Sequence, residues 1–144
     1  MGLILATGET VFVDTAPLIY FFEDNDTYIK RLTAFFDQVA ESNVVLVTSM
    51  VTYIEILTHP ERTGDKRLAA KYRDFLTNSE QISMYPLNVS VADAAVRLRA
   101  GHQLKTPDAI QLATAEVCGA DHVVTNDVKW RRVPGFHVVT VDEL

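Results

Sequence analysis

The sequence predicts an α/β fold in three layers, with a central parallel sheet of five strands and helices on both faces. Short β-branched runs alternate with amphipathic segments along the chain, which is the pattern of strand–helix–strand units. One segment, "NVVLVTS", contains four consecutive apolar residues, as expected for a strand that is buried on both faces. A length of 144 residues suits one such unit, so we expect a single domain spanning residues 1–144.

The first half of the chain predicts two strands and three helices. "TVFVDT" is a β-branched run that ends at Asp14 and predicts a strand near residues 11–13. "APLIYFFE" predicts a short helix, and "YIKRLTAFFDQVAES" a longer one with apolar residues at helical spacing. "NVVLVTS" predicts a second strand near residues 44–48. "MVTYIEILTHP" follows as a helix that is expected to end near Pro60.

The second half continues the alternation. "GDKRLAAKYRDFLTNS" is amphipathic, "ISMYPLN" predicts a strand near residues 83–86, and "SVADAAVRLRAG" predicts a helix ending at Gly101. In "LKTPDAIQLATAEVCGA", Thr106 is expected to cap a helix and Pro107 to occupy its first position. "DHVVTND" and "FHVVTVDEL" predict the last two strands, near residues 122–125 and 137–141.

Composition and charge limit the function classes. The net charge of −6 argues against nucleic-acid binding by bulk attraction, so any phosphate contact requires local cations. The single Cys118 excludes an internal disulfide and fits a reducing compartment. The N-terminal "MGLILATGET" has no basic residue before its apolar run and is a poor signal peptide, and no run is long enough to span a membrane. We therefore expect a cytoplasmic protein.

Four carboxylates are predicted to meet at the carboxyl edge of the sheet. Asp14 directly follows the first strand, and Asp127 follows the fourth. Glu55 lies in the helix after the second strand, and Asp108 opens the helix that runs back toward the start of the fourth. Ligands of open α/β sheets bind beyond this edge. Carboxylates brought together repel unless a cation lies among them, and oxygen ligands of this kind suit Mg²⁺ or Mn²⁺.

Each acid also has a simpler interpretation when it is taken alone. Asp14 and Asp127 fit helix caps or turns, Asp108 fits a first-turn partner of the helix dipole, and Glu55 fits a solvated helix side. Because all four acids are predicted at the same sheet edge, we favour one joint metal site over four unrelated structural roles. The spacing of the histidines predicts no zinc site and no catalytic role for them, since they are scattered along the chain. They are His59, His102, His122 and His137.

Four motifs carry a resemblance to a known family. "VFVDTAPLIYFFE", "TSMVTYIEIL", "LKTPDAIQLATA" and "VVTND" occur in this order with suitable separations. Together they resemble the PIN-domain nucleases, most closely the VapC-type toxins of bacterial and archaeal toxin–antitoxin pairs. The resemblance covers nearly the whole chain and implies a PIN-like fold. It also implies that Asp14, Glu55, Asp108 and Asp127 are the metal-binding and catalytic acids.

The resemblance has further implications for partners and supporting residues. It implies cleavage of RNA with Mg²⁺ or Mn²⁺, a homodimer, and inhibition by a cognate antitoxin protein, with no membrane involved. Thr15, Ser49 and Thr125 match small polar positions beside the acids, and Asn126 is a further candidate for the cleft. The basic side chains nearest the predicted cleft are candidates for RNA phosphate contacts. They are Lys105, Lys129, Arg131 and Arg132.

The leading hypothesis is a metal-dependent endoribonuclease, in which a metal-activated water hydrolyses the phosphodiester bond, and which serves as the toxin of a type II toxin–antitoxin system. One alternative is a structure-specific DNA nuclease that uses the same acids. Another is a regulatory module that binds RNA or protein without catalysis. An aspartyl-phosphate phosphatase is disfavoured, because that chemistry usually needs a second Asp two residues after the first, where this chain has Ala16. The sequence does not identify the target RNA.

Overall fold

The computed structural model describes residues 2–144, so Met1 of the predicted domain lies outside the described residues. Its centre is a five-stranded parallel sheet in the order β3-β2-β1-β4-β5. All five predicted strands are confirmed to within one residue at each end. They are β1 (Thr10–Val13), β2 (Val45–Ser49), β3 (Ile82–Tyr85), β4 (His122–Thr125) and β5 (Val138–Thr140).

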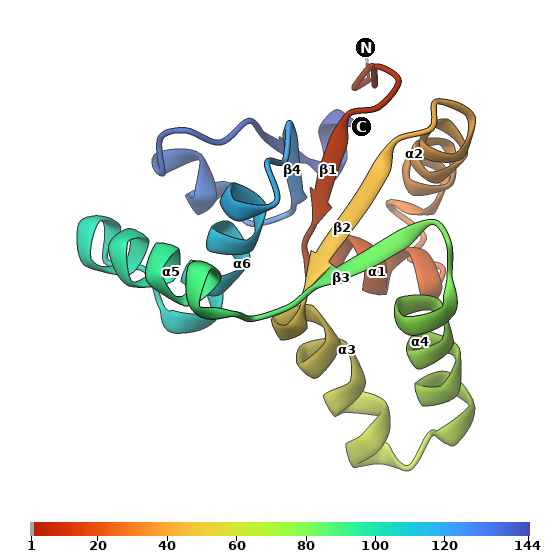
Figure 1. The fold of residues 1–144 in the computed structure, drawn as a ribbon. Coiled ribbons are helices and arrows are strands. Elements are labelled where there is room, and N and C mark those ends of the chain that lie inside the picture. The colour runs from red at the N-terminus through yellow and green to blue at the C-terminus, as the bar shows by residue number, and fades with distance from the viewer. Residues whose placement is uncertain (1) are drawn as a thin grey trace.

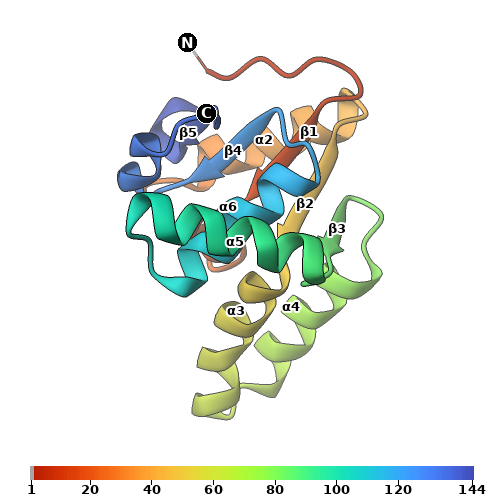
Figure 2. The ribbon, with the colours of Figure 1, turned by 60° about the vertical axis from the view of Figure 1, so that its left-hand side comes forward.

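Helices cover both faces of the sheet (Figures 1 and 2). The first face carries α1 (Thr15–Phe22), α2 (Ile29–Glu41), α3 (Met50–Thr63) and α4 (Lys66–Asn78). The second face carries α5 (Val89–His102) and α6 (Thr106–Val117), and two 3₁₀ turns, η1 (Val128–Arg132) and η2 (Val141–Glu143), flank β5. The predicted three-layer α/β class is therefore confirmed. None of the helices in residues 2–144 is long and apolar enough to cross a bilayer.

The central strand β1 is apolar at three successive positions because both of its faces are buried. Val11 and Val13 pack into the core under α1 and α2, whereas Phe12 packs against α5 and α6. All three side chains are fully buried. Successive side chains of a strand point to opposite faces, so a strand with helices on both sides needs apolar residues at every position.

Three helix ends differ from the prediction. Helix α3 passes through Pro60 and ends at Thr63, before Gly64 in the left-handed conformation (φ 75°). A proline removes one backbone donor but keeps its acceptor, and the Pro60 carbonyl accepts from the Asp65 N–H at 2.9 Å. Helix α5 likewise passes Gly101 and ends before Gln103, whose φ of 55° closes it.

The third difference lies at the start of α6. Its N-cap is Lys105, and no side chain caps it, so the prediction that Thr106 is the cap was wrong. Thr106 is instead the first helical residue. Pro107 is the second helical residue and not the first as predicted, but it still lies in the first turn, where its fixed φ is suitable and its missing N–H has no helical partner to lose.

The strand order creates a crevice between β1 and β4. The chain moves from β1 outward to β2 and β3, then returns to the other side of β1 to form β4. Val13 pairs with Val124 in the ladder, and the Asp14 N–H donates to the Val124 carbonyl at 2.9 Å. The residues that follow these two strands therefore meet at the switch point, where ligands of such sheets bind.

Candidate active site

Asp14 lies at the centre of this crevice. It follows β1 and forms the N-cap of α1, with its Oδ1 accepting from the Thr15 N–H at 2.7 Å. Thr125, the last residue of β4, donates its hydroxyl proton to Asp14 Oδ2 at 2.7 Å. The pKa of Asp14 is raised to about 6, chiefly by burial and to a lesser extent by the charges of Glu55 and Asp108, although these two hydrogen bonds lower it.

A pocket of about 300 Å³ joins Asp14 to Glu55 and Asp108. Glu55 lies on an exposed side of α3, and its Oε1 accepts a hydrogen bond from Thr15 Oγ1 at 2.7 Å. The solvated-helix interpretation is therefore right about its exposure, yet Thr15 still ties it to the pocket. Asp108 lies in the first turn of α6, and its pKa is raised by burial and then by the charge of Asp127.

Asp127 lines a second pocket of about 280 Å³, and Asp108 borders both pockets. The Asp127 N–H donates to Thr125 Oγ1 at 3.0 Å, so the Thr125 hydroxyl links Asp14 to Asp127. Within residues 2–144, no group of three or more His, Cys, Asp or Glu side chains has metal-binding geometry. The four acids thus reach one edge of the sheet as predicted, but they divide between two adjoining pockets instead of sharing one cleft.

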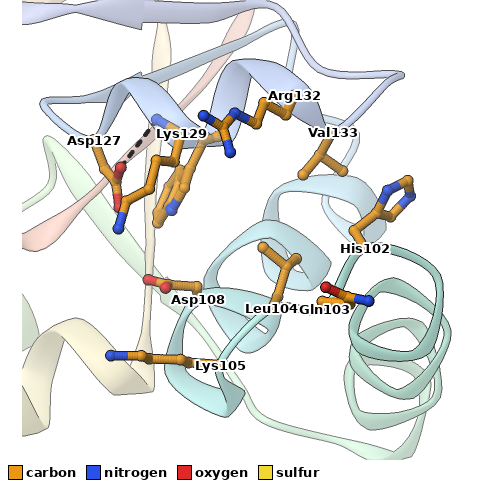
Figure 3. Close-up of a pocket in the computed structure, with 10 residues that line it drawn as sticks. His102, Gln103, Leu104, Lys105, Asp108, Asp127, Lys129, Arg132 and Val133 are labelled. Carbon is orange, nitrogen blue, oxygen red and sulfur yellow. Dashed lines mark hydrogen bonds between the residues drawn. The ribbon is translucent and has the colours of Figure 1, made fainter.

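Three of the four predicted cations line the second pocket. Figure 3 shows Lys105 beside Asp108 at the start of α6, with Asp127, Lys129 and Arg132 across the pocket on and beside η1. Arg131 does not line it, because its guanidinium forms an ion pair with Glu143. The pocket therefore presents positive charge next to two carboxylates, although the whole chain is acidic.

The second pocket also has a buried donor. Trp130 is 2% exposed and lines the pocket beside Asp108 and Asp127. Among the described residues its indole N–H has no acceptor at full hydrogen-bonding geometry, but it lies close enough to the Asp108 carboxylate to lower the pKa of that group. The indole N–H therefore favours the charged form of Asp108 and opposes the burial that raises its pKa.

A buried polar network that we did not predict lies behind Asp14. The Gln111 amide of α6 donates to Asp14 Oδ1 at 3.0 Å and to Thr52 Oγ1 at 3.0 Å. Ser49, the N-cap of α3, donates to the Gln111 carbonyl oxygen. Gln111 is only 2% exposed, so these contacts fix its side chain and, through it, the Asp14 carboxylate.

One signal in the sequence pointed to Gln111. It lies three residues after Asp108, and Ala109, Leu112 and Ala113 around it are apolar. A polar side chain in such surroundings needs buried partners. Among the predicted polar residues, Thr15 and Thr125 contact the acids directly and Ser49 contacts them through Gln111. Asn126 lines neither pocket.

Comparisons with known proteins agree with this architecture. A family model described as PIN domain matches residues 11–136. A DNA-bound VapBC structure from Salmonella typhimurium is similar, with 18% identity over 92% of this chain and 98% of that chain and a TM-score of 0.75. Comparison with curated protein sequences gave no match.

Two further solved structures are similar at the level of the fold. A toxin–antitoxin complex from Klebsiella pneumoniae shares 24% identity over 93% of this chain and 99% of that chain, with a TM-score of 0.69. VapC20 of Mycobacterium tuberculosis, a sarcin–ricin loop cleaving toxin, shares 19% identity over 88% of this chain and 95% of that chain, with a TM-score of 0.70.

Proposed function

This chain belongs to the PIN domain family, and from that premise we propose that it is an endoribonuclease that requires Mg²⁺ or Mn²⁺. The observation that carries the proposal is the pocket in which Asp14, Glu55 and Asp108 converge, with Asp127 joined to Asp14 through Thr125. The charges of Glu55 and Asp108 oppose the ionisation of Asp14, and a carboxylate that served only as a helix cap would gain nothing from such neighbours.

The chemistry of these residues fits a hard divalent cation. Every charged ligand candidate offers carboxylate oxygen, which Mg²⁺ and Mn²⁺ prefer. Asp14, Glu55 and Asp108 would hold the ion, and Asp127 would hold a second ion or orient the waters of the first. The raised pKa of Asp14 is consistent with this assignment, because a nearby cation would stabilise the charged form against burial and against the charges of Glu55 and Asp108. When bound, such an ion activates a water molecule and offsets the charge that develops on phosphate oxygens.

The chain itself supplies orientation and charge. Thr125 and Gln111 hold the two oxygens of Asp14, and Thr15 holds Glu55, so that both carboxylates are fixed before substrate arrives. Lys105, Lys129 and Arg132 would contact backbone phosphates of RNA in the second pocket. The indole N–H of Trp130 would help to keep the Asp108 carboxylate ionised.

The biological role that we propose is that of a VapC-type toxin. The similar structures include VapBC and other toxin–antitoxin complexes, and VapC20 is described as a sarcin–ricin loop cleaving toxin. We accordingly infer a cognate antitoxin as protein partner, a homodimer, and a cytoplasmic site of action. A helix of the antitoxin entering an apolar groove would be the most plausible mode of inhibition.

The decisive experiment is cleavage of total RNA with mapped ends. The purified chain should cleave with Mg²⁺ or Mn²⁺ and not with EDTA. The products should carry 5′-phosphate and 3′-hydroxyl ends, because in the proposed reaction water attacks the phosphorus and the 3′ oxygen leaves. Asp14→Asn should lose cleavage by at least about a hundredfold, because it removes an acid at the centre of the site. Asp37→Asn, on an exposed part of α2, is the matched control and should keep wild-type activity.

Matched RNA and DNA oligonucleotides assayed side by side test the substrate class. Faster cleavage of DNA would replace the ribonuclease assignment with the DNA nuclease. Wild-type cleavage by Asp14→Asn would overturn the site. RNA binding that is insensitive to EDTA, with no cleavage of any RNA, would favour the regulatory module.

A further inference from the structure

A second cluster of chemically active side chains lies at the opposite edge of the sheet. His122 is the first residue of β4, His137 immediately precedes β5, and Glu9 immediately precedes β1. The ladder brings them together, because Val11 pairs with His122 and the Val123 N–H donates to the His137 carbonyl at 2.9 Å. Along β4, His122 lies about 10 Å from Thr125 and hence from the acidic pockets.

The two imidazoles face each other through the same ring atom. Nδ1 of His122 lies 2.7 Å from Nδ1 of His137, and the ring centroids are 4.9 Å apart. Nε2 of His122 lies 3.0 Å from Glu9 Oε2. A carboxylate oxygen can only accept, so neutral His122 carries its proton on Nε2. The Nδ1 lone pair of His122 therefore points at His137, which donates its own Nδ1–H.

This arrangement has the elements of a metal site. A carboxylate that holds the far N–H of a histidine fixes its tautomer and increases the basicity of the ligating nitrogen. Two imidazole nitrogens at right angles on one ion, each about 2.1 Å from it, lie about 3 Å apart. The observed 2.7 Å is within a few tenths of an ångström of that separation. Slight rotation of the exposed His137 ring would open the space once His137 carries its proton on Nε2, which frees its Nδ1 lone pair.

We propose that His122 and His137 form a binding site for Zn²⁺, Ni²⁺ or Cu²⁺, with Glu9 holding His122 in place. Imidazole nitrogen suits these ions, whereas Mg²⁺ and Mn²⁺ prefer oxygen, so the site takes a different class of ion from the acidic pockets. The group contains no third ligating side chain in the described chain, and water completes the coordination shell. The bound ion joins the starts of β4 and β5 and stabilises the short edge strand.

Calorimetric titration with Ni²⁺ or Zn²⁺ in a large excess of Mg²⁺ tests the proposal, because Mg²⁺ occupies the carboxylates. An Asp14→Asn background removes one of those acids and keeps the test independent of nuclease activity. We expect one equivalent of Ni²⁺ to bind. Affinity should fall at least about tenfold in His122→Asn and in His137→Asn, and about tenfold in Glu9→Gln. His59→Asn, at an exposed position of α3, is the control and should bind as the parent does.

Thermal unfolding gives a second readout. Ni²⁺ at about a hundredfold excess over the Kd of the parent should raise the Tm of the parent by roughly 5–10 °C, and that of His137→Asn by about half as much or less. His137 is exposed, so this variant keeps the fold even if His122→Asn does not. Equal Ni²⁺ affinity in the parent and in His137→Asn would overturn the proposal, as would the absence of Ni²⁺ binding by the parent.

Discussion

Replacing Thr125 by valine should move the acid limb of the proposed cleavage reaction to higher pH. The Thr125 hydroxyl donates to Asp14 Oδ2 at 2.7 Å and accepts from the Asp127 N–H at 3.0 Å. Valine has nearly the same shape and fills the same fully buried space, but it makes neither hydrogen bond. The carboxylate form of Asp14 loses its strongest side-chain donor, and the pKa of Asp14 therefore rises above its value of about 6.

The size of the effect follows from the contact. A hydrogen bond to a charged group contributes about 1.5–3 kcal/mol, which corresponds to a rise of about 1–2 in pKa. Asp14 is partly exposed, and water replaces part of the lost bond, so we expect a value near the lower limit. The pKa of Asp14 in the variant would then be about 7, and half of the molecules would carry a protonated Asp14 at neutral pH.

The assay is a pH–rate profile of RNA cleavage at fixed Mg²⁺. The acid limb of kcat/KM reports the free enzyme and should shift by about one pH unit in Thr125→Val. Thr48→Val is a close control. Thr48 is also fully buried at this end of the sheet, but its hydroxyl donates to the Val13 carbonyl at 2.7 Å and not to an acid. Thr48→Val should lose stability and keep the parent profile.

Two results would refute this reasoning. If the acid limb of Thr125→Val coincided with that of the parent, the Thr125 hydroxyl would not control the ionisation of Asp14. If Thr48→Val shifted the limb equally, the shift would reflect general loosening of the sheet edge and not the hydrogen bond.

Three further predictions concern neighbouring parts of the site. Gln111→Leu removes the acceptor of the Ser49 hydroxyl and the donor to Asp14 and Thr52, and should lower the free energy of unfolding by about 2–4 kcal/mol in urea titrations, with a loss of cleavage. The native pKa of Asp14 exceeds its ordinary value of 3.8, so the stability that protonated Asp14 contributes is lost as the pH rises through about 6. Mn²⁺ binds the ionised carboxylate, and it should therefore raise the Tm more at about pH 7 than at about pH 5. Lys105→Ala and Lys129→Ala should each weaken binding of a single-stranded RNA and reduce the slope of log K against log salt by about 0.7, whereas Arg131→Ala should leave that slope unchanged.

The positions of the acids were predictable because they depend on chain direction alone. Asp14 and Asp127 follow buried parallel strands, and such strands present their carboxyl ends at one edge. Asp108 could be placed because α6 runs back toward the start of β4. These inferences need only the alternation of strands and helices, which the apolar periodicity of the sequence reports directly.

The division of the acids into two pockets was not predictable in this way. The hydrogen bonds from Thr15, Thr125 and Gln111 to the acids were not predictable either, because the paired residues lie 40 to 111 positions apart in the sequence. The contact between the two histidines could not be predicted from the sequence for a related reason. His122 and His137 show no ligand spacing along the chain and become neighbours only through the register of β4 and β5.

Asp14 and Asp127 each serve the fold as well as the site, since Asp14 caps α1 and Asp127 caps η1. Asparagine and serine cap helices about as well as aspartate, whereas alanine does not. Loss of nuclease activity and loss of folding are therefore separable at these two positions. A related chain that has lost cleavage but still folds should therefore carry asparagine or serine at these two positions. Such residues would indicate that the chain descends from a nuclease.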